Sequence, residues 1–155
     1  HPQEERTVEL VCSMRTENMP SVRKLIQDKV RKFNPKTDKL LPALHAERLC
    51  KTLINVVTTG TGSSSRTHTD TLAAGALLLA EEGIEHIKLL PNVDLVEDEH
   101  FVTFNLENIS GKLKDLLGNR AEVDRIRTNG LKAFNKGYDM TLSAKQLRDY
   151  LYAKF

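Results

Sequence analysis

The run SRTHTDTLAAGALLL, residues 65–79, decides the fold that we expect for this chain. Polar and small residues give way to a continuous apolar run, a pattern that predicts a loop, a short helix and then a buried strand. The preceding residues 58–64 are rich in Gly, Ser and Thr, and such small residues let a backbone approach a ligand closely. The helix would point its free N–H groups and the positive end of its dipole toward this loop.

This loop and helix start therefore form a candidate anion site, most simply for a phosphate. Asp70 would stand about one turn into the helix, where a carboxylate could bind sugar hydroxyls. Two simpler interpretations stay open. The loop could be only a flexible connection, and Asp70 could only stabilise the first turns of the helix.

The composition is typical of a globular protein with one domain, or of one half of a two-domain enzyme. The 155 residues are 39% hydrophobic and 28% charged, so they can form a substantial core. No apolar run approaches the ~20 residues that span a bilayer. A formal net charge of +2 and the absence of Trp argue against a nucleic-acid partner.

The two cysteines, Cys12 and Cys50, lie in apolar stretches far apart in the sequence. This spacing does not make a zinc site, and buried free thiols are the favoured interpretation, with one disulfide left open. Free thiols weakly favour the reducing cytosol. The chain begins His1-Pro2 rather than with Met, so we leave its first residues out of the fold prediction and interpret it as part of a longer or processed protein.

Strands and helices are predicted to alternate along most of the chain. The expected strands are 7–12, 53–57, 76–80 and 101–104, and the expected helices begin at residues 20, 43, 67, 108, 121 and 141. This order predicts an α/β fold: a Rossmann-like parallel sheet flanked by helices, in one domain over residues 1–155. In such sheets ligands bind beyond the carboxyl ends of the strands, where the loops after Val57 and Leu79 would lie.

Helical spacing also predicts which side chains are buried. The helix from Pro20 would bury Val22, Leu25, Ile26, Val30 and Phe33, and the closing helix would bury Leu147, Tyr150 and Leu151. The C-terminal helices, over about residues 107–155, are accordingly expected to pack on the domain.

The order of these parts resembles the C-terminal, nucleotide-sugar-binding half of a GT-B glycosyltransferase of the group 1 or spore-maturation-protein-like type. The resemblance rests on Arg66, Asp70 and the LAAG motif at 72–75, followed by an apolar strand. It continues with the VDRIRTNG phrase at 123–130 and a closing helix over 143–152, so it covers nearly the whole chain. Four departures are visible. Asp70 stands where the family usually has Glu, and the spacing from Arg66 to this acid is one residue longer. The second acid of many members would fall around Gly62, and the Arg/Lys pair that many members place on the donor pyrophosphate has no clear counterpart.

The resemblance implies a nucleoside-diphosphate sugar as donor, with no metal ion and no other cofactor. The leaving diphosphate needs positive potential, which helix N-termini and basic side chains supply. By this analogy Asp70 binds the ribose hydroxyls. The diphosphate would be held by Ser64, Ser65, Arg66 and Thr67, with Gly62 allowing close approach, and Arg15 and Arg23 are weaker phosphate candidates.

The resemblance also implies an acceptor-binding half that would precede His1, so the catalytic residues stay unassigned and this chain alone would have little transferase activity. One alternative is a catalytically inactive glycosyltransferase-like module that binds or scaffolds a partner. Another is an α/β enzyme with a nucleophile among Ser63, Ser64 and Ser65, but the chain has no Gly-x-Ser-x-Gly elbow. A P-loop is excluded, because residues 60–65 lack the Gly-Lys-Ser/Thr ending.

Overall fold

The structure, a computed structural model, describes residues 5–12, 20–59 and 65–154. Three of the predicted site residues, Arg15, Gly62 and Ser64, lie outside the described residues.

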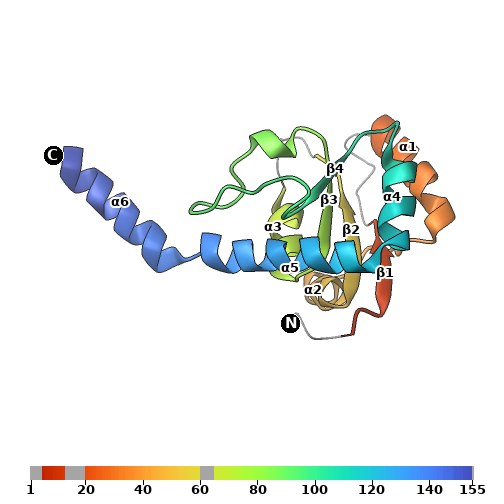
Figure 1. The fold of residues 1–155 in the computed structure, drawn as a ribbon, viewed down its shortest axis with the longest axis horizontal. Helices are drawn as coiled ribbons and strands as arrows, with labels where there is room; N and C mark the ends of the chain where they lie inside the picture. Colours follow the sequence, from red (N-terminus) through yellow and green to blue (C-terminus); the bar gives the residue numbers. More distant parts are fainter. Residues whose placement is uncertain (1–4, 13–19, 60–64, 155) are drawn as a thin grey trace.

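Four parallel strands form the centre of the molecule (Figure 1). They are β1 (Val8–Val11), β2 (Thr52–Val57), β3 (Leu77–Glu81) and β4 (Val102–Phe104), and they lie side by side in this order. Ile54 of β2 is in register with Leu10 on one side and with Leu77 on the other. The predicted α/β fold with a parallel sheet is confirmed.

Helices connect and cover the strands. They are α1 (Pro20–Val30), α2 (Pro42–Cys50), α3 (Arg66–Ala73), α4 (Ile109–Gly118), α5 (Arg120–Gly137) and α6 (Met140–Lys154), with single 3-10 turns at Arg31–Phe33 and Ile84–His86. Each expected element is present and begins within one residue of its predicted start. The local patterns therefore predicted the elements well.

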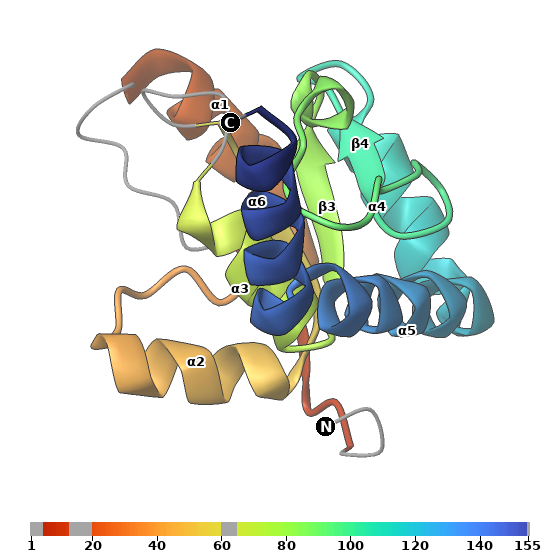
Figure 2. The same ribbon diagram turned by 90° about the vertical axis from the view of Figure 1, so that its left-hand side faces the viewer.

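The sheet has an apolar core on each face. In β3, Leu77 and Leu79 pack in the core that includes α1 and α4, whereas Leu78 and Ala80 pack in the core that includes Leu72 of α3. Figure 1 shows α1 and α4 on one side of the strands and α3 on the other, and Figure 2 shows α5 below β3 and β4. Successive residues alternate between the two cores because side chains along a strand point to opposite faces.

The predicted burial is correct for part of α1 and wrong for α6. Ile26 and Val30 are buried, but Val22 and Leu25 are partly exposed, because the covering elements reach only one side of the helix. Leu147 and Leu151 are 61% and 47% exposed, because α6 leads away from the body of the molecule instead of packing on it (Figure 1). Helices α4 and α5 do pack on the domain.

Both cysteines are free thiols, Cys12 buried and Cys50 half-buried. Burial raises the pKa of the Cys12 thiol to about 12, which makes this thiol a poor nucleophile. Within the described part of the chain, the helices are too short or too polar to cross a membrane.

Gly130 in α5 marks a close approach between this helix and the chain before β4. A Cβ atom at Gly130 would lie 2.6 Å from the His100 carbonyl oxygen and 3.0 Å from Leu72 Cδ2. Since the nearest atom belongs to the backbone, it cannot simply rotate away. This contact explains the glycine in the Asn-Gly phrase of α5.

We therefore predict that Gly130→Ala lowers the free energy of unfolding by about 1–3 kcal/mol, because the added methyl group overpacks the contact. Gly111→Ala in α4 is the matched control, since a Cβ there meets nothing within 4 Å. That change should stabilise the protein by about 0.5–1 kcal/mol through helix propensity. Urea unfolding of both variants checks the prediction, and equal effects would contradict the proposed contact.

Candidate functional site

The carboxyl ends of β2 and β3 are joined through Thr59, which follows β2. The Thr59 N–H and hydroxyl donate to Glu81 Oε2, with distances of 2.9 and 2.8 Å, and Glu81 is the last residue of β3. Arg23 of α1 donates from Nη2 to the Thr59 carbonyl oxygen at 2.8 Å. The Glu81 carboxylate and the Arg23 guanidinium thus both bind Thr59 at the point where the chain leaves β2.

The first turn of α3 lies at the same edge of the sheet, because α3 follows the loop that leaves β2. Ser65 is the N-cap residue in an extended conformation, and its N–H donates to His68 Nδ1 at 3.0 Å. The N–H groups of Arg66 and Thr67 stand in the first turn, where a helix offers no acceptor of its own. This turn can therefore bind an anion.

The His68 side chain fixes the geometry of this turn and is fully buried. Burial lowers the pKa of the imidazole, and the contact with the Ser65 backbone raises it by a smaller amount. In the neutral ring Nδ1 can accept the Ser65 N–H, whereas in the charged ring Nδ1 would donate to the Ser65 carbonyl oxygen, which also lies 3.0 Å away. The tautomer assigned from this bond carries its proton on Nε2, which has no hydrogen-bond partner within the described residues.

Arg66 and Asp70 contact each other on the outer side of α3. Arg66 Nε lies 3.4 Å from Asp70 Oδ2, and the two side chains are 90% and 41% exposed. Exposed pairs of this kind contribute only about 0–1 kcal/mol, so either side chain can turn to a ligand at little cost. Thr67 is half-buried, and its carbonyl oxygen accepts the Thr71 hydroxyl.

A buried hydrogen bond fixes α3 against the sheet. Asn55 of β2 donates from Nδ2 to Thr71 Oγ1 at 2.8 Å, and both residues are buried. Buried polar groups need such partners, so this bond restricts how α3 can lie over β2. The first turn of α3 is thereby held in place relative to the strand ends.

The structure places Ser65, Arg66, Thr67 and Asp70 together on the first turns of α3. Arg23 comes from a different helix and reaches the same edge, where its Nη2 binds a backbone carbonyl. Sequence reasoning missed Thr59, Glu81 and His68. The position of Glu81 at the end of a predicted strand was the one signal that could have pointed to this edge.

Among the residues that the structure describes, no group of three His, Cys, Asp or Glu side chains is placed to hold a metal ion.

Three solved structures share this fold. An alpha-glucosyltransferase in complex with UDP-glucose and DNA containing an abasic site is 15% identical, with a TM-score of 0.59 over 94% of this chain and 44% of that chain. The Anabaena protein HepE in complex with UDP is 12% identical, with a TM-score of 0.63 over 98% of this chain and 43% of that chain. Sucrose-phosphate synthase from Thermosynechococcus elongatus is 13% identical, with a TM-score of 0.58 over 94% of this chain and 39% of that chain.

These similarities confirm the predicted fold, a Rossmann-like domain of the kind found in GT-B glycosyltransferases. The chain spans less than half the length of each of these three neighbours. No family model and no curated protein matches the sequence.

The buried neutral His68 makes stability depend on pH. Its pKa in the folded protein is below the unfolded value of 6.5, so the unfolded chain binds the proton more tightly. Stability should therefore fall as the pH drops below about 6.5, with a slope of up to about 1.4 kcal/mol per pH unit.

Urea unfolding of wild type and His68→Asn between about pH 5 and pH 8 measures this slope. The slope should decrease in His68→Asn, whatever its overall stability. It should remain in His86→Gln, because His86 is exposed on its 3-10 turn. The same slope in wild type and His68→Asn would contradict the assignment.

Proposed function

We propose that this chain is the nucleotide-sugar-binding half of a glycosyltransferase that moves a sugar from a nucleoside-diphosphate donor to an acceptor. The observation that carries the proposal is the first turn of α3, which lies at the carboxyl edge of the sheet and can bind an anion. Two solved structures with the same fold are complexes with UDP-glucose and with UDP, which supports a donor of this class.

The proposed donor site divides between phosphate and sugar groups. Ser65, Arg66 and Thr67 would bind the diphosphate, together with Gly62 and Ser64 of the preceding loop. Asp70 would bind the ribose hydroxyls, because a carboxylate attracts hydroxyl donors and repels phosphate. The exposed pair of Arg66 and Asp70 supports this division, since the two side chains lie side by side with opposite charge.

The same residues suggest how the chain would assist sugar transfer. As the glycosidic bond breaks, negative charge grows on the leaving diphosphate, and fixed positive potential lowers the energy of that transition state. The helix N-terminus and Arg66 would supply this potential without a metal ion. Arg23 would act by holding Thr59 and by adding positive charge at the strand ends, because its Nη2 donates to the Thr59 carbonyl.

The acceptor site and the catalytic base would come from a companion half. The structural neighbours are more than twice as long as their matched parts, which supports such an arrangement. We therefore expect this chain alone to bind the donor and to transfer sugar poorly.

Isothermal titration of the chain with UDP-glucose, UDP and GDP tests the donor site. Asp70→Ala should weaken binding by about 5- to 150-fold, which corresponds to about 1–3 kcal/mol for a lost polar interaction. Asp94→Ala is the matched control, because Asp94 is also an exposed carboxylate paired with a cation, Lys88. No binding by folded wild type would reject the donor site and leave the non-enzymatic module as the function of this fold.

The nucleoside alone separates the two proposed roles. Arg66→Ala should weaken UDP binding and leave uridine binding unchanged, because uridine carries no phosphate. Asp70→Ala should weaken both ligands by a similar factor, because both contain the ribose. Equal losses for uridine in the two variants would contradict the division of the site.

A further inference from the structure

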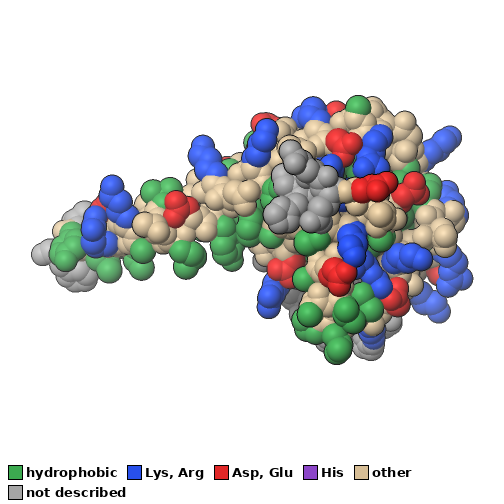
Figure 3. All heavy atoms as spheres, turned by 90° about the horizontal axis from the view of Figure 1, so that it is seen from below, with side chains coloured by type: hydrophobic (Ala, Val, Ile, Leu, Met, Phe, Trp, Pro, Cys, Tyr) green, Lys and Arg blue, Asp and Glu red, His purple; other side chains and the backbone are tan. Residues whose placement is uncertain are grey.

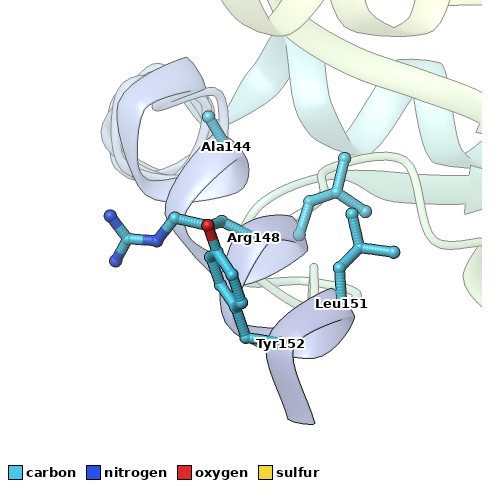
Figure 4. Close-up of a pocket in the computed structure, with 5 residues that line it drawn as sticks. Ala144, Arg148, Leu151 and Tyr152 are labelled. Carbon is cyan, nitrogen blue, oxygen red and sulfur yellow. The ribbon is translucent and has the colours of Figure 1, made fainter. Parts of the chain in front are cut away.

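Two hollows in the surface of the described chain differ in their chemistry. Figure 3 shows hydrophobic side chains along one side of the projecting helix α6, and a hollow of about 510 Å³ lies there (Figure 4). Its walls come from that single helix. The second hollow, of about 380 Å³, lies on α5 and is lined mainly by polar and charged side chains. Since polar groups that converge on a hollow give a site its specificity, the α5 hollow is the better candidate for binding a ligand.

The α5 hollow lies between α5 and the chain that leads into β4. The residues that line it are Val93, Glu99 and His100 before β4, and Asn129, Lys132, Ala133 and Lys136 on α5. The α5 members share one face of the helix, because they recur at intervals of three and four positions. Glu99 and His100 precede β4, so the hollow lies away from the carboxyl edge at which α3 begins.

Close contacts fix the two walls of the α5 hollow against each other. At one end is the approach of Gly130 to the His100 carbonyl oxygen. At the other end, a Cβ atom at Gly137 would lie 2.9 Å from Leu90 Cβ. The Gly137 carbonyl oxygen also accepts the Asn92 N–H at 3.3 Å and Asn92 Nδ2 at 3.2 Å. The hollow is therefore preformed, which lowers the entropy cost of binding a ligand.

The α5 side of the hollow carries positive charge without a counterion. Lys132 and Lys136 are exposed, and neither forms an ion pair with another residue that the structure describes. The arginines of α5, in contrast, pair with acids of the same helix: Arg120 and Arg127 with Asp124, and Arg125 with Glu122. Two like charges four positions apart on a helix repel each other, so an anion between the two lysines is favoured.

His100, Asn129 and Glu99 add hydrogen-bonding groups to the hollow. His100 Nδ1 accepts the Val96 N–H at 2.9 Å, so the tautomer assigned from this bond carries its proton on Nε2. Asn129 is half-buried, and its amide forms no hydrogen bond with the described part of the chain. The Glu99 carboxylate, whose Oε1 lies 3.8 Å from His100 Nε2, can accept hydroxyl groups. The hollow thus combines cations with a hydroxyl acceptor.

We propose that the α5 hollow binds a small phosphate ester that carries hydroxyl groups. The phosphate lies between Lys132 and Lys136, because ammonium groups bind phosphate as point charges. The carbon atoms of the ester lie over Val93 and Ala133, and its hydroxyl groups donate to Glu99, a carboxylate that repels a second anionic group. The volume of about 380 Å³ falls within the roughly 300–1,000 Å³ of small-molecule sites, so it has room for more than a phosphate ion.

Titration of the ¹⁵N-labelled chain with glycerol 3-phosphate, followed by two-dimensional NMR, tests this site. The amide signals of residues 93–100 and 129–136 should shift with a dissociation constant of about 0.1–1 mM, because both lysines are exposed. The signals of residues 65–70 report the proposed donor site separately. The absence of a donor site would therefore leave this proposal standing, whereas the absence of shifts at 93–100 and 129–136 with about 10 mM ester would overturn it.

Charge variants test the two lysines. Lys132→Gln and Lys136→Gln should each weaken the binding of glycerol 3-phosphate by about 5-fold, because each loses one exposed charge interaction. Lys114→Gln is the matched control: Lys114 is an exposed lysine on α4 outside the hollow, and its loss should leave the affinity unchanged. Circular dichroism checks that all variants are folded. Equal losses in Lys114→Gln and Lys132→Gln would reveal nonspecific attraction and overturn the proposal.

Two further probes test the chemical class of the ligand. Glycerol should cause no shifts, because it carries no charge for the lysines. Inorganic phosphate should bind at least about 5-fold more weakly than glycerol 3-phosphate, because it lacks the carbon atoms and the hydroxyl groups. Equal affinity for the two phosphates would mean an adventitious ion only and would overturn the proposed ester site.

Discussion

The buried guanidinium of Arg6 connects segments of the chain that lie far apart in the sequence. It donates to the carbonyl oxygens of Leu49 at 3.1 Å, Thr52 at 3.2 Å and Ala74 at 3.0 Å, and also to that of Cys50. These carbonyls belong to the end of α2, the start of β2 and the residue that follows α3. A cation suits this place, because helix C-termini carry partial negative charge and carbonyls without intrahelical partners.

The position of α3 follows from this contact and from two others. Arg6 holds the carboxyl end of α3, the Asn55–Thr71 bond holds its middle against β2, and His68 shapes its first turn. Gly75 follows α3 with a φ of 70°, and a Cβ there would meet Arg6 Nη2 at 3.0 Å, so glycine suits both the turn and the contact. The donor site that we propose thus lies at one end of a helix whose other end is fixed by a buried charge.

Helix α6 lies outside the packed body of the molecule. The core of the sheet is covered by α1, α3, α4 and α5, whereas α6 keeps an apolar side in contact with solvent. The hydrophobic effect drives such a surface toward a partner, and the partner is not contained in the described part of the chain. The packed domain and the exposed apolar side of α6 are therefore separate features, joined by the short connection that Asn92 fixes.

The sequence by itself determined the elements and their class. Each strand and helix is encoded locally by apolar periodicity, and strand–helix alternation implies a parallel sheet, so the carboxyl-edge position of residues 65–70 was predictable. Only the tertiary structure decided which apolar faces are covered and which distant polar groups meet. Periodicity identified the apolar side of α6 but could not show that no other element covers it. The hydrogen bonds of Arg6 and Glu81 join residues that lie 22 to 68 positions apart in the sequence. The reason is physical: local patterns constrain neighbours along the chain, whereas burial and long-range hydrogen bonds depend on how all the elements pack together.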